Sequence, residues 1–305
     1  MLPRSVDRIT LLAFAVATLI LGANWVGVRF SNRELPPFWG AALRFTAASA
    51  ILFAVVGLRG ILLPRGRALA GALLAGVLIF GASFALLYWA LVAVPAGMTS
   101  VVFATLPLIT LFVSAVAGFE RITTQAIIGV LIAITGLGII FGAQITADIE
   151  IIRLLAVLLG GLVSAVATVV VKSFPRTHPI ATTSIAMGTG AVFLFVASFI
   201  AGESRAVPAA TETWLALAYL VTSSTIGFSL MTLVMLRWTP SASSYGTVLS
   251  PVVAIVLATL IAGEIFGPVF FFGAAIVGLG VYVGALAKTA RVTPIAPGAP
   301  ATSAD

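Results

Sequence analysis

The sequence predicts an all-α membrane protein whose ten transmembrane helices form two five-helix repeats of opposite orientation. Of its 305 residues, 61% are hydrophobic and only 8% are charged, whereas a soluble domain carries about 25% charged residues. Apolar runs of about 20 residues, the length of helix that crosses a bilayer, recur along the whole chain. A set of landmark residues that recurs at one fixed offset predicts the repeat.

Each apolar run is expected to form one membrane-spanning helix. The runs are continuous and rich in Ala, Leu, Gly and Val, whereas a transmembrane β-barrel would show short segments of alternating polarity. The first run follows a basic N-terminus, as in a signal peptide, but it is about 20 residues long and lacks a small-x-small cleavage pattern, so we expect an uncleaved span. The expected spans are residues 9–28, 37–57, 68–90, 95–118, 123–143, 153–173, 179–201, 213–236, 240–263 and 268–287.

The distribution of Lys and Arg predicts that both termini are cytoplasmic, because cytoplasmic loops are enriched in these residues. With the N-terminus inside, the external loops hold Arg29, Arg33, Arg153 and Arg205. The cytoplasmic segments hold Arg4, Arg8, Arg59, Arg65, Arg67, Arg121, Lys172, Arg176, Arg237, Lys288 and Arg291. We expect a bacterial cell inner-membrane protein with a cytoplasmic N-terminus (1–8) and a disordered cytoplasmic tail (288–305) rich in Pro, Ala and Gly.

The two halves, residues 9–143 and 153–287, share landmarks at an offset of 144 residues. In each half a mid-span proline is followed 13 residues later by a glutamate, and two glycines keep the same register. The matched pairs are Pro107 and Pro251, Glu120 and Glu264, Gly129 and Gly273, and Gly136 and Gly280. Because five spans are an odd number, the second half enters the membrane from the opposite side. Inverted repeats of this kind build many secondary transporters, with binding sites between the halves.

Short motifs in a fixed order carry a family resemblance over residues 9–287. They are Gly22-Ala23-Asn24-Trp25, Ala42-Leu43-Arg44-Phe45, Tyr88-Trp89-Ala90-Leu91, Leu106-Pro107-Leu108, Gly118-Phe119-Glu120, Gly129 to Gly138, Ser250-Pro251-Val252, Gly263-Glu264 and Gly273 to Gly280. With this pattern the chain resembles the EamA branch of the drug/metabolite transporter superfamily. In outline it is similar to exporters of aromatic and hydrophobic amino acids of the YddG type.

The resemblance implies ten helices in a 5+5 inverted repeat around a central cavity. It implies that spans 1, 3, 4, 6, 8 and 9 line the cavity and that spans 5 and 10 are peripheral. Family members export amino acids, other metabolites or drugs. The second half has no counterpart to Arg44, because its matching region, 184–188, is uncharged. Which half would bind a charged group of the substrate therefore stays open.

Arg44 is the charged residue that lies well inside an expected span. A charge at that depth is costly and is a functional candidate by default. It could bind a substrate carboxylate. Alternatively, it could extend to the external interface or pair with a backbone carbonyl or with Glu34.

Polar and aromatic side chains on the expected cavity spans are the other binding candidates. Asn24 needs a hydrogen-bond partner in hydrocarbon, either the substrate or a neighbouring helix. Trp25 could line the cavity or belong to an interfacial aromatic belt. Phe84 and Tyr88 lie one turn apart on one helix face and could stack on an apolar substrate, or simply pack. The candidates are Asn24, Trp25, Arg44, Phe84, Tyr88, Thr99, Phe103, Ser164, Thr168, Phe228 and Tyr245.

Paired prolines and glutamates have candidate roles in motion and capping. Pro107 and Pro251 could act as hinges, or could produce static kinks. Glu120 and Glu264 precede spans 5 and 10, where a carboxylate interacts favourably with the helix dipole.

The residue inventory excludes several classes of chemistry. The sequence has no Cys and one His, His178, so we expect neither a protein-held metal nor a cofactor. An intramembrane enzyme would need a buried catalytic set that these spans lack, so we expect no enzyme. No Asp or Glu lies inside an expected span and no nucleotide-binding loop is present, which favours a facilitator or exchanger over proton- or ATP-driven transport.

We therefore expect a secondary transporter that moves small metabolites by alternating access. Export of hydrophobic or aromatic amino acids, or of related amphipathic solutes, is favoured over phosphorylated substrates, which would need several basic groups. Export of drugs or other metabolites is the alternative, and a non-transporting scaffold is a remote one. The expected partners are a small-molecule substrate and the lipid bilayer, not nucleic acid, and we expect a monomer, with a dimer as the alternative.

Overall fold

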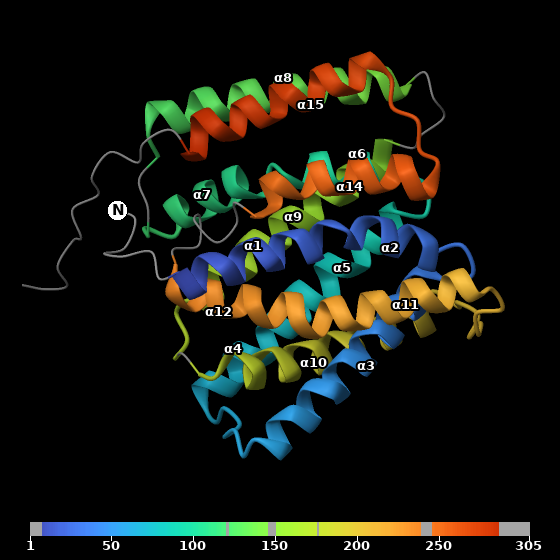
Figure 1. Cartoon of the computed structure of the whole chain (residues 1–305). Helices are drawn as coiled ribbons and strands as arrows, with labels where there is room; N and C mark the ends of the chain where they lie inside the picture. The colour runs from blue at the N-terminus through green and yellow to red at the C-terminus, as the bar shows by residue number, and fades with distance from the viewer. Residues whose placement is uncertain (1–7, 120–121, 146–150, 176, 239–245, 287–305) are drawn as a thin grey trace, which may run out of the picture.

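The computed structural model describes residues 8–119, 122–145, 151–175, 177–238 and 246–286 (Figure 1). All regular elements in these ranges are helical. Seven helices are long and apolar enough to cross a membrane: residues 8–31, 37–58, 67–90, 96–116, 151–171, 179–200 and 211–235. Three shorter apolar helices cover residues 124–140, 249–262 and 268–284 of the described chain.

The helices follow the predicted order of spans closely. In the first half, span 1 comprises α1 (Arg8–Gly22) and α2 (Asn24–Ser31), and span 2 is α3 (Pro37–Leu58). Span 3 comprises α4 (Arg67–Ala75), η1 (Gly76–Ser83) and α5 (Phe84–Ala90). Span 4 comprises α6 (Ala96–Phe103) and α7 (Leu106–Val116), and span 5 is α8 (Thr124–Ile145). In the second half, span 6 is α9 (Ile151–Val171) and span 7 is α10 (Pro179–Ile200). Span 8 comprises α11 (Thr211–Ser223), η2 (Ser224–Phe228) and α12 (Ser229–Arg237). Span 9 is α14 (Gly246–Ala262), and span 10 comprises α15 (Pro268–Val281) and η3 (Tyr282–Leu286).

Prolines and glycines set several helix ends. Pro37, Pro179 and Pro268 occupy the first turn of α3, α10 and α15, where the missing N–H has no partner to lose. Gly202 and Gly263 follow α10 and α14 with φ of 65° and 67°. This left-handed conformation ends a helix and turns the chain back across it.

Spans 3 and 8 each contain a π-helical segment, η1 and η2. At the 144-residue offset, η2 falls on residues 80–84, so the two segments overlap in the repeat. π-Helical turns in α-helices occur frequently at functional sites. Spans 1 and 4 are also interrupted, at Ala23 and at residues 104–105.

The packing of the helices obeys exchange of the two halves. α3 packs along α10, and α8 along α15, so that each pair joins equivalent spans of the two repeats. In Figure 1 these two pairs lie at opposite edges of the bundle. Between them, α1 packs on α14 just as α7 packs on α9, and spans 1 and 8 pack as spans 6 and 3 do. The predicted fold, ten helices in a 5+5 repeat, is confirmed.

The glycines matched in the sequence are the contact points between α8 and α15. A Cβ at Gly136 would lie 2.8 Å from the Gly273 carbonyl oxygen, and a Cβ at Gly280 would lie 2.7 Å from the Gly129 carbonyl oxygen. Each contact maps onto the other when the halves are exchanged. Small residues allow transmembrane helices to approach this closely.

The outward surface of the bundle is apolar, as lipid contact requires. Large side chains such as Leu260 and Phe199 are 76% and 74% exposed. Such exposure of hydrophobic residues over a whole soluble protein would be unfavourable.

Replacing Gly136 with Leu should destabilise the protein by about 1–3 kcal/mol or more, because overpacking here meets backbone atoms that cannot rotate away. A lower thermal unfolding temperature in detergent would report this. Gly138→Leu is the matched control on the same helix, since a Cβ there meets nothing within 4 Å. Equal unfolding temperatures for the two variants would contradict the backbone contact.

Candidate functional site

A cavity of about 230 Å³ lies between the two halves. Its wall is formed by spans 1, 2, 3, 4, 6, 7, 8 and 9, and α8 and α15 contribute none of it. The cavity extends from the region of Val28 and Leu91 to Thr182 in the first turn of α10 and Met235 in the last turn of α12. It therefore runs along most of the length of the bundle, since Val28 and Leu91 lie near the ends of spans 1 and 3.

Aromatic rings dominate the centre of the cavity. Phe84 and Phe228, which correspond at the 144-residue offset, meet with their ring centroids 5.7 Å apart. Phe80 packs against both rings, at 6.0 Å and 5.1 Å, and Phe45 packs behind Phe80 and Phe84. The π-helical segments and the residues next to them supply three of these rings, so the irregular backbone of spans 3 and 8 shapes the apolar centre.

Arg44 is fully buried at the cavity wall. Its Nε donates to Ser224 Oγ at 2.6 Å and its Nη1 donates to Tyr88 Oη at 3.2 Å. Its Cζ lies 5.0–6.0 Å from the rings of Phe45, Phe84 and Phe228, a cation–π arrangement. Its Nη2 has no hydrogen-bond partner in the described part of the protein. The alternative prediction that Arg44 pairs with Glu34 was wrong, because Arg44 bonds to Ser224 and Tyr88, whereas the Glu34 carboxylate accepts from the Ala210 N–H.

Asn24 and Trp25 both line the cavity, and both also tie helices together. Asn24 Oδ1 accepts from Ser223 Oγ at 2.6 Å, which joins spans 1 and 8. Trp25 Nε1 donates to Ser250 Oγ at 2.7 Å, and its ring packs edge-on against Phe103. Trp25 thus faces the protein interior and not an interfacial belt.

The remaining candidates divide between the cavity and other positions. Ser164, Thr168 and Phe103 line the cavity, and Thr168 corresponds to Asn24 at the repeat offset. Thr99 does not line the cavity, and its hydroxyl donates to the Pro95 carbonyl within span 4. Tyr245 lies outside the described residues.

The two matched prolines occupy different local positions. Pro107 stands in the first turn of α7, after the interruption of span 4, whereas Pro251 lies inside α14. A hinge at either position stays a prediction.

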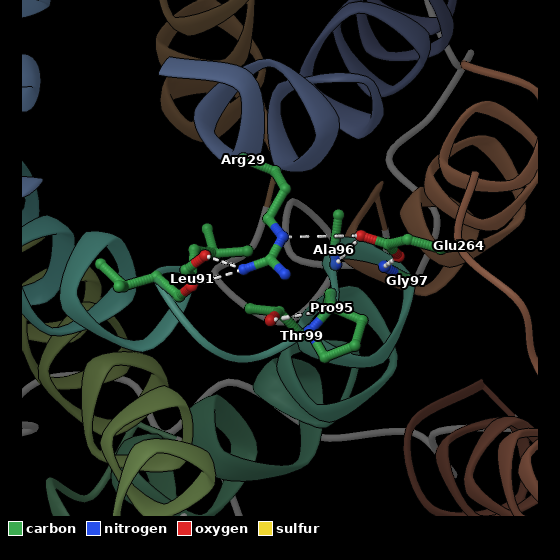
Figure 2. Close-up of polar contacts among 8 residues, drawn as sticks. Arg29, Leu91, Pro95, Ala96, Gly97, Thr99 and Glu264 are labelled. Atoms are coloured by element: carbon green, nitrogen blue, oxygen red, sulfur yellow. Dashed lines mark hydrogen bonds and ion pairs between the residues drawn. The ribbon is translucent and has the colours of Figure 1, made fainter. Parts of the chain in front are cut away.

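At the end of the bundle opposite Thr182, glutamates hold the starts of neighbouring helices. The Glu203 carboxylate accepts from the Phe38 N–H at 3.1 Å and from the Trp39 N–H at 2.8 Å. The Glu264 carboxylate accepts from the Ala96 N–H at 2.8 Å and from the Gly97 N–H at 3.2 Å (Figure 2). We call this end, marked by Glu203 and Glu264, the clamped end.

Each clamp follows the same sequence, Ala-Gly-Glu, at 201–203 and 262–264. The left-handed glycine directs the next residue back toward the adjacent helix start. Free N–H groups and the positive end of the helix dipole favour a carboxylate there. The expected dipole interaction of Glu264 was therefore assigned to the wrong helix, because its partner is α6 of span 4 and not span 10. Glu120 lies outside the described residues.

Arg29 closes the same end from span 1. Its Nη1 donates to the carbonyls of Leu91 and Val92, at 2.9 Å and 2.6 Å, and its Nε lies 4.0 Å from Glu264 Oε1 (Figure 2). Asn32 Nδ2 donates to the Tyr88 carbonyl at 3.0 Å. The last turn of α5 is thus held by α2, which covers the cavity beyond Leu91.

Sequence reasoning missed Phe45, Phe80 and the Glu203 clamp. The 144-residue offset could have paired Phe84 with Phe228, and the doubled Ala-Gly-Glu could have pointed to the clamps. Within the described residues, no group of three or more His, Cys, Asp or Glu side chains could hold a metal ion.

Comparison with known proteins assigns the family. The model of the EamA-like transporter family matches twice, over residues 8–142 and 151–285. The chain is 29% identical over 275 residues to the "Uncharacterized inner membrane transporter YedA" of Escherichia coli K12, covering 88% of each chain. It is 31% identical over 239 residues to a "Probable terminal-alkyne amino-acid exporter" of Streptantibioticus cattleyicolor, covering 76% of this chain and 78% of the relative.

A solved crystal structure shares the fold. It superposes with a TM-score of 0.70 at 20% sequence identity, over 92% of this chain and 97% of its own. The two matches of the family model fall on the two five-helix halves, and the protein is a multi-pass membrane protein and not an enzyme. The chain belongs to the EamA-like transporter family.

Proposed function

We propose that this protein exports hydrophobic or aromatic amino acids, or closely related amphipathic solutes, by alternating access. The observation that carries the proposal is the aromatic cavity between the two halves, with Phe84 and Phe228 face to edge at its centre and Arg44 in its wall. Rings of this kind bind apolar side chains, and a few polar groups orient the rest of the ligand. The amino-acid substrate named for the Streptantibioticus relative supports the same class.

The distribution of basic residues orients the transport path. The positive-inside rule places both termini in the cytoplasm, so the clamped end faces outward and the cavity extends toward the cytoplasm. This arrangement suits loading of substrate from the cytoplasm. Rocking of one half against the other would then expose the same residues to the outside.

Pro107 and Pro251 are candidate hinges for this motion, because Pro251 removes a hydrogen bond inside α14 and Pro107 follows the interruption of span 4. The working unit is proposed to be a monomer, since one chain supplies every wall of the cavity. The bacterial inner membrane is the proposed location, in keeping with the relative YedA.

Purified protein in liposomes should transport labelled phenylalanine or leucine, and Phe84→Ala should lower that transport by about tenfold through lost aromatic packing. Flux is measured for a panel of amino acids, cationic dyes and phosphorylated metabolites, with and without a pH gradient. Leu131→Ala, on the lipid-facing side of α8, is the control substitution. Flux of dyes alone would favour the multidrug alternative, and no flux of any compound would favour a scaffold.

Glu264→Gln should weaken the clamp at α6 and open the cavity outward more often, because a neutral amide accepts weaker hydrogen bonds than a carboxylate. The chain has no natural cysteine, so Val28→Cys gives one thiol at the clamped end of the cavity. A membrane-impermeant maleimide added outside should label this thiol several-fold faster in the Glu264→Gln background.

The matched control is Glu212→Gln, which removes an exposed carboxylate on α11 that pairs with Arg33. It should leave the labelling rate unchanged. Equal labelling rates for Glu264→Gln and for the parent would show that Glu264 does not help to close the cavity on the outer side.

A further inference from the structure

We infer that the cavity is selective for anions, with Arg44 as the anchor for a carboxylate, and that the membrane potential drives export of such a ligand. This inference rests on the proposed function and specifies its substrate class. The guanidinium group of Arg44 is only partly hydrogen-bonded. Two of its nitrogens, Nε and Nη1, are occupied by Ser224 and Tyr88, while Nη2 has no partner in the described chain.

No carboxylate in the described ranges compensates the charge of Arg44. All nine acidic residues of the sequence lie outside the predicted spans: Asp7, Glu34, Glu120, Asp148, Glu150, Glu203, Glu212, Glu264 and Asp305. Among the described residues, none that lines the cavity is acidic. Aromatic faces and hydroxyls stabilise the guanidinium only in part, and an unpaired buried cation is unfavourable.

The fold itself does not require a cation at this position. In the second repeat, α10 starts at Pro179 where α3 starts at Pro37, so the residue that corresponds to Arg44 is Ala186, an apolar residue that also lines the cavity. The partners of Arg44 are not repeated either, since Tyr88 corresponds to Thr232 and Ser224 to Phe80. The polar centre is therefore not duplicated: Arg44 and Tyr88 come from the first half, Ser224 comes from the second, and the scaffold around them is symmetric.

A carboxylate on the ligand would complete this centre. It would accept a charge-assisted hydrogen bond from Nη2, while the apolar part of the ligand rests on Phe84 and Phe228. An ammonium group would meet hydroxyls and rings but no carboxylate. The site therefore suits amphipathic monocarboxylates, does not depend on an α-ammonium group, and disfavours cations.

The same charges indicate the driving force. Arginine keeps its charge over the physiological pH range, and the part of the cavity wall that the structure describes holds no acid or histidine that could exchange a proton. Each outward passage of a monoanion then moves one negative charge. With the inside negative, this favours the outside concentration by about 50-fold for every 100 mV.

Three ligands with one phenyl tail test the inference: phenylpropanoate (an anion), phenylalanine (a zwitterion) and phenylethylamine (a cation). Binding to the purified full-length protein is measured by tryptophan fluorescence, since Trp25 lines the cavity. We expect phenylpropanoate to bind at least as tightly as phenylalanine, and phenylethylamine to bind about tenfold or more weakly. Arg44→Gln should weaken the anion about tenfold or more and leave the cation unchanged or tighter.

Arg44→Lys, which retains the charge, should keep the preference for anions, and Arg33→Gln, an exposed arginine at the clamped end, is the control. In liposomes, an inside-negative potassium diffusion potential should accelerate efflux of phenylpropanoate but not of phenylalanine. Equal binding of anion and cation, an equal loss of all three ligands in Arg44→Gln, or potential-independent efflux would overturn the inference. Phenylalanine flux without any charge preference would leave the proposed function standing and refute this inference alone.

Discussion

Hydrocarbon offers no partner to a buried hydrogen-bonding group, and the whole structure depends on this constraint. It makes every span a helix, because only a helix satisfies its own backbone N–H and C=O groups within a single segment. It also explains why hydroxyl groups along the spans bond to backbone carbonyls of their own helix, as Thr168 does to the Ser164 carbonyl one turn earlier. The polar groups that the helices cannot satisfy themselves are paired between helices, as Ser83 Oγ is with Ser164 Oγ.

The two halves meet in two different ways, and the difference locates the cavity. At the edges, α8 with α15 and α3 with α10 are packed closely, and in the first pair glycine brings backbone against backbone. In the centre, spans 1, 3 and 8 line the cavity with large aromatic or amide side chains, and span 6 lines it with Ser164, Thr168 and Val171. Closely packed edges around a central cavity are the arrangement that the proposed rocking of the halves requires.

The sequence predicted the spans well, because composition alone determines which segments enter lipid. The predicted span 68–90 is observed as α4, η1 and α5 over 67–90, and span 179–201 as α10. The repeat was also predictable from residues in register, since Gly136 and Gly273 turned out to touch. Each of these predictions depends on local pattern.

Partner choice was not predictable, because it depends on three-dimensional packing. Arg44 bonds to Ser224, 180 residues away, although Glu34 is the nearer opposite charge in the sequence. Glu264 caps α6 instead of the helix that follows it, since the left-handed turn at Gly263 points it backward. Thr99 was predicted to line the cavity as a hydroxyl residue on an expected cavity span, but its hydroxyl donates to the Pro95 carbonyl of its own span.

The Ala-Gly-Glu clamp on α3 has a thermodynamic consequence for an inverted repeat. If the halves were identical, exchanging them would convert the inward-facing conformation into the outward-facing one, so the two would have equal free energy and equal occupancy. The end of α10 carries Glu203, whereas the equivalent end of α3 carries Ile61 after Gly60. A hydrogen bond to a charged group contributes about 1.5–3 kcal/mol, and about 1.4 kcal/mol is a tenfold change in an equilibrium constant. One residue that differs between two duplicated copies therefore makes them unequal by an energy large enough to shift an equilibrium about tenfold, wherever its contact is made in one conformation and broken in the other.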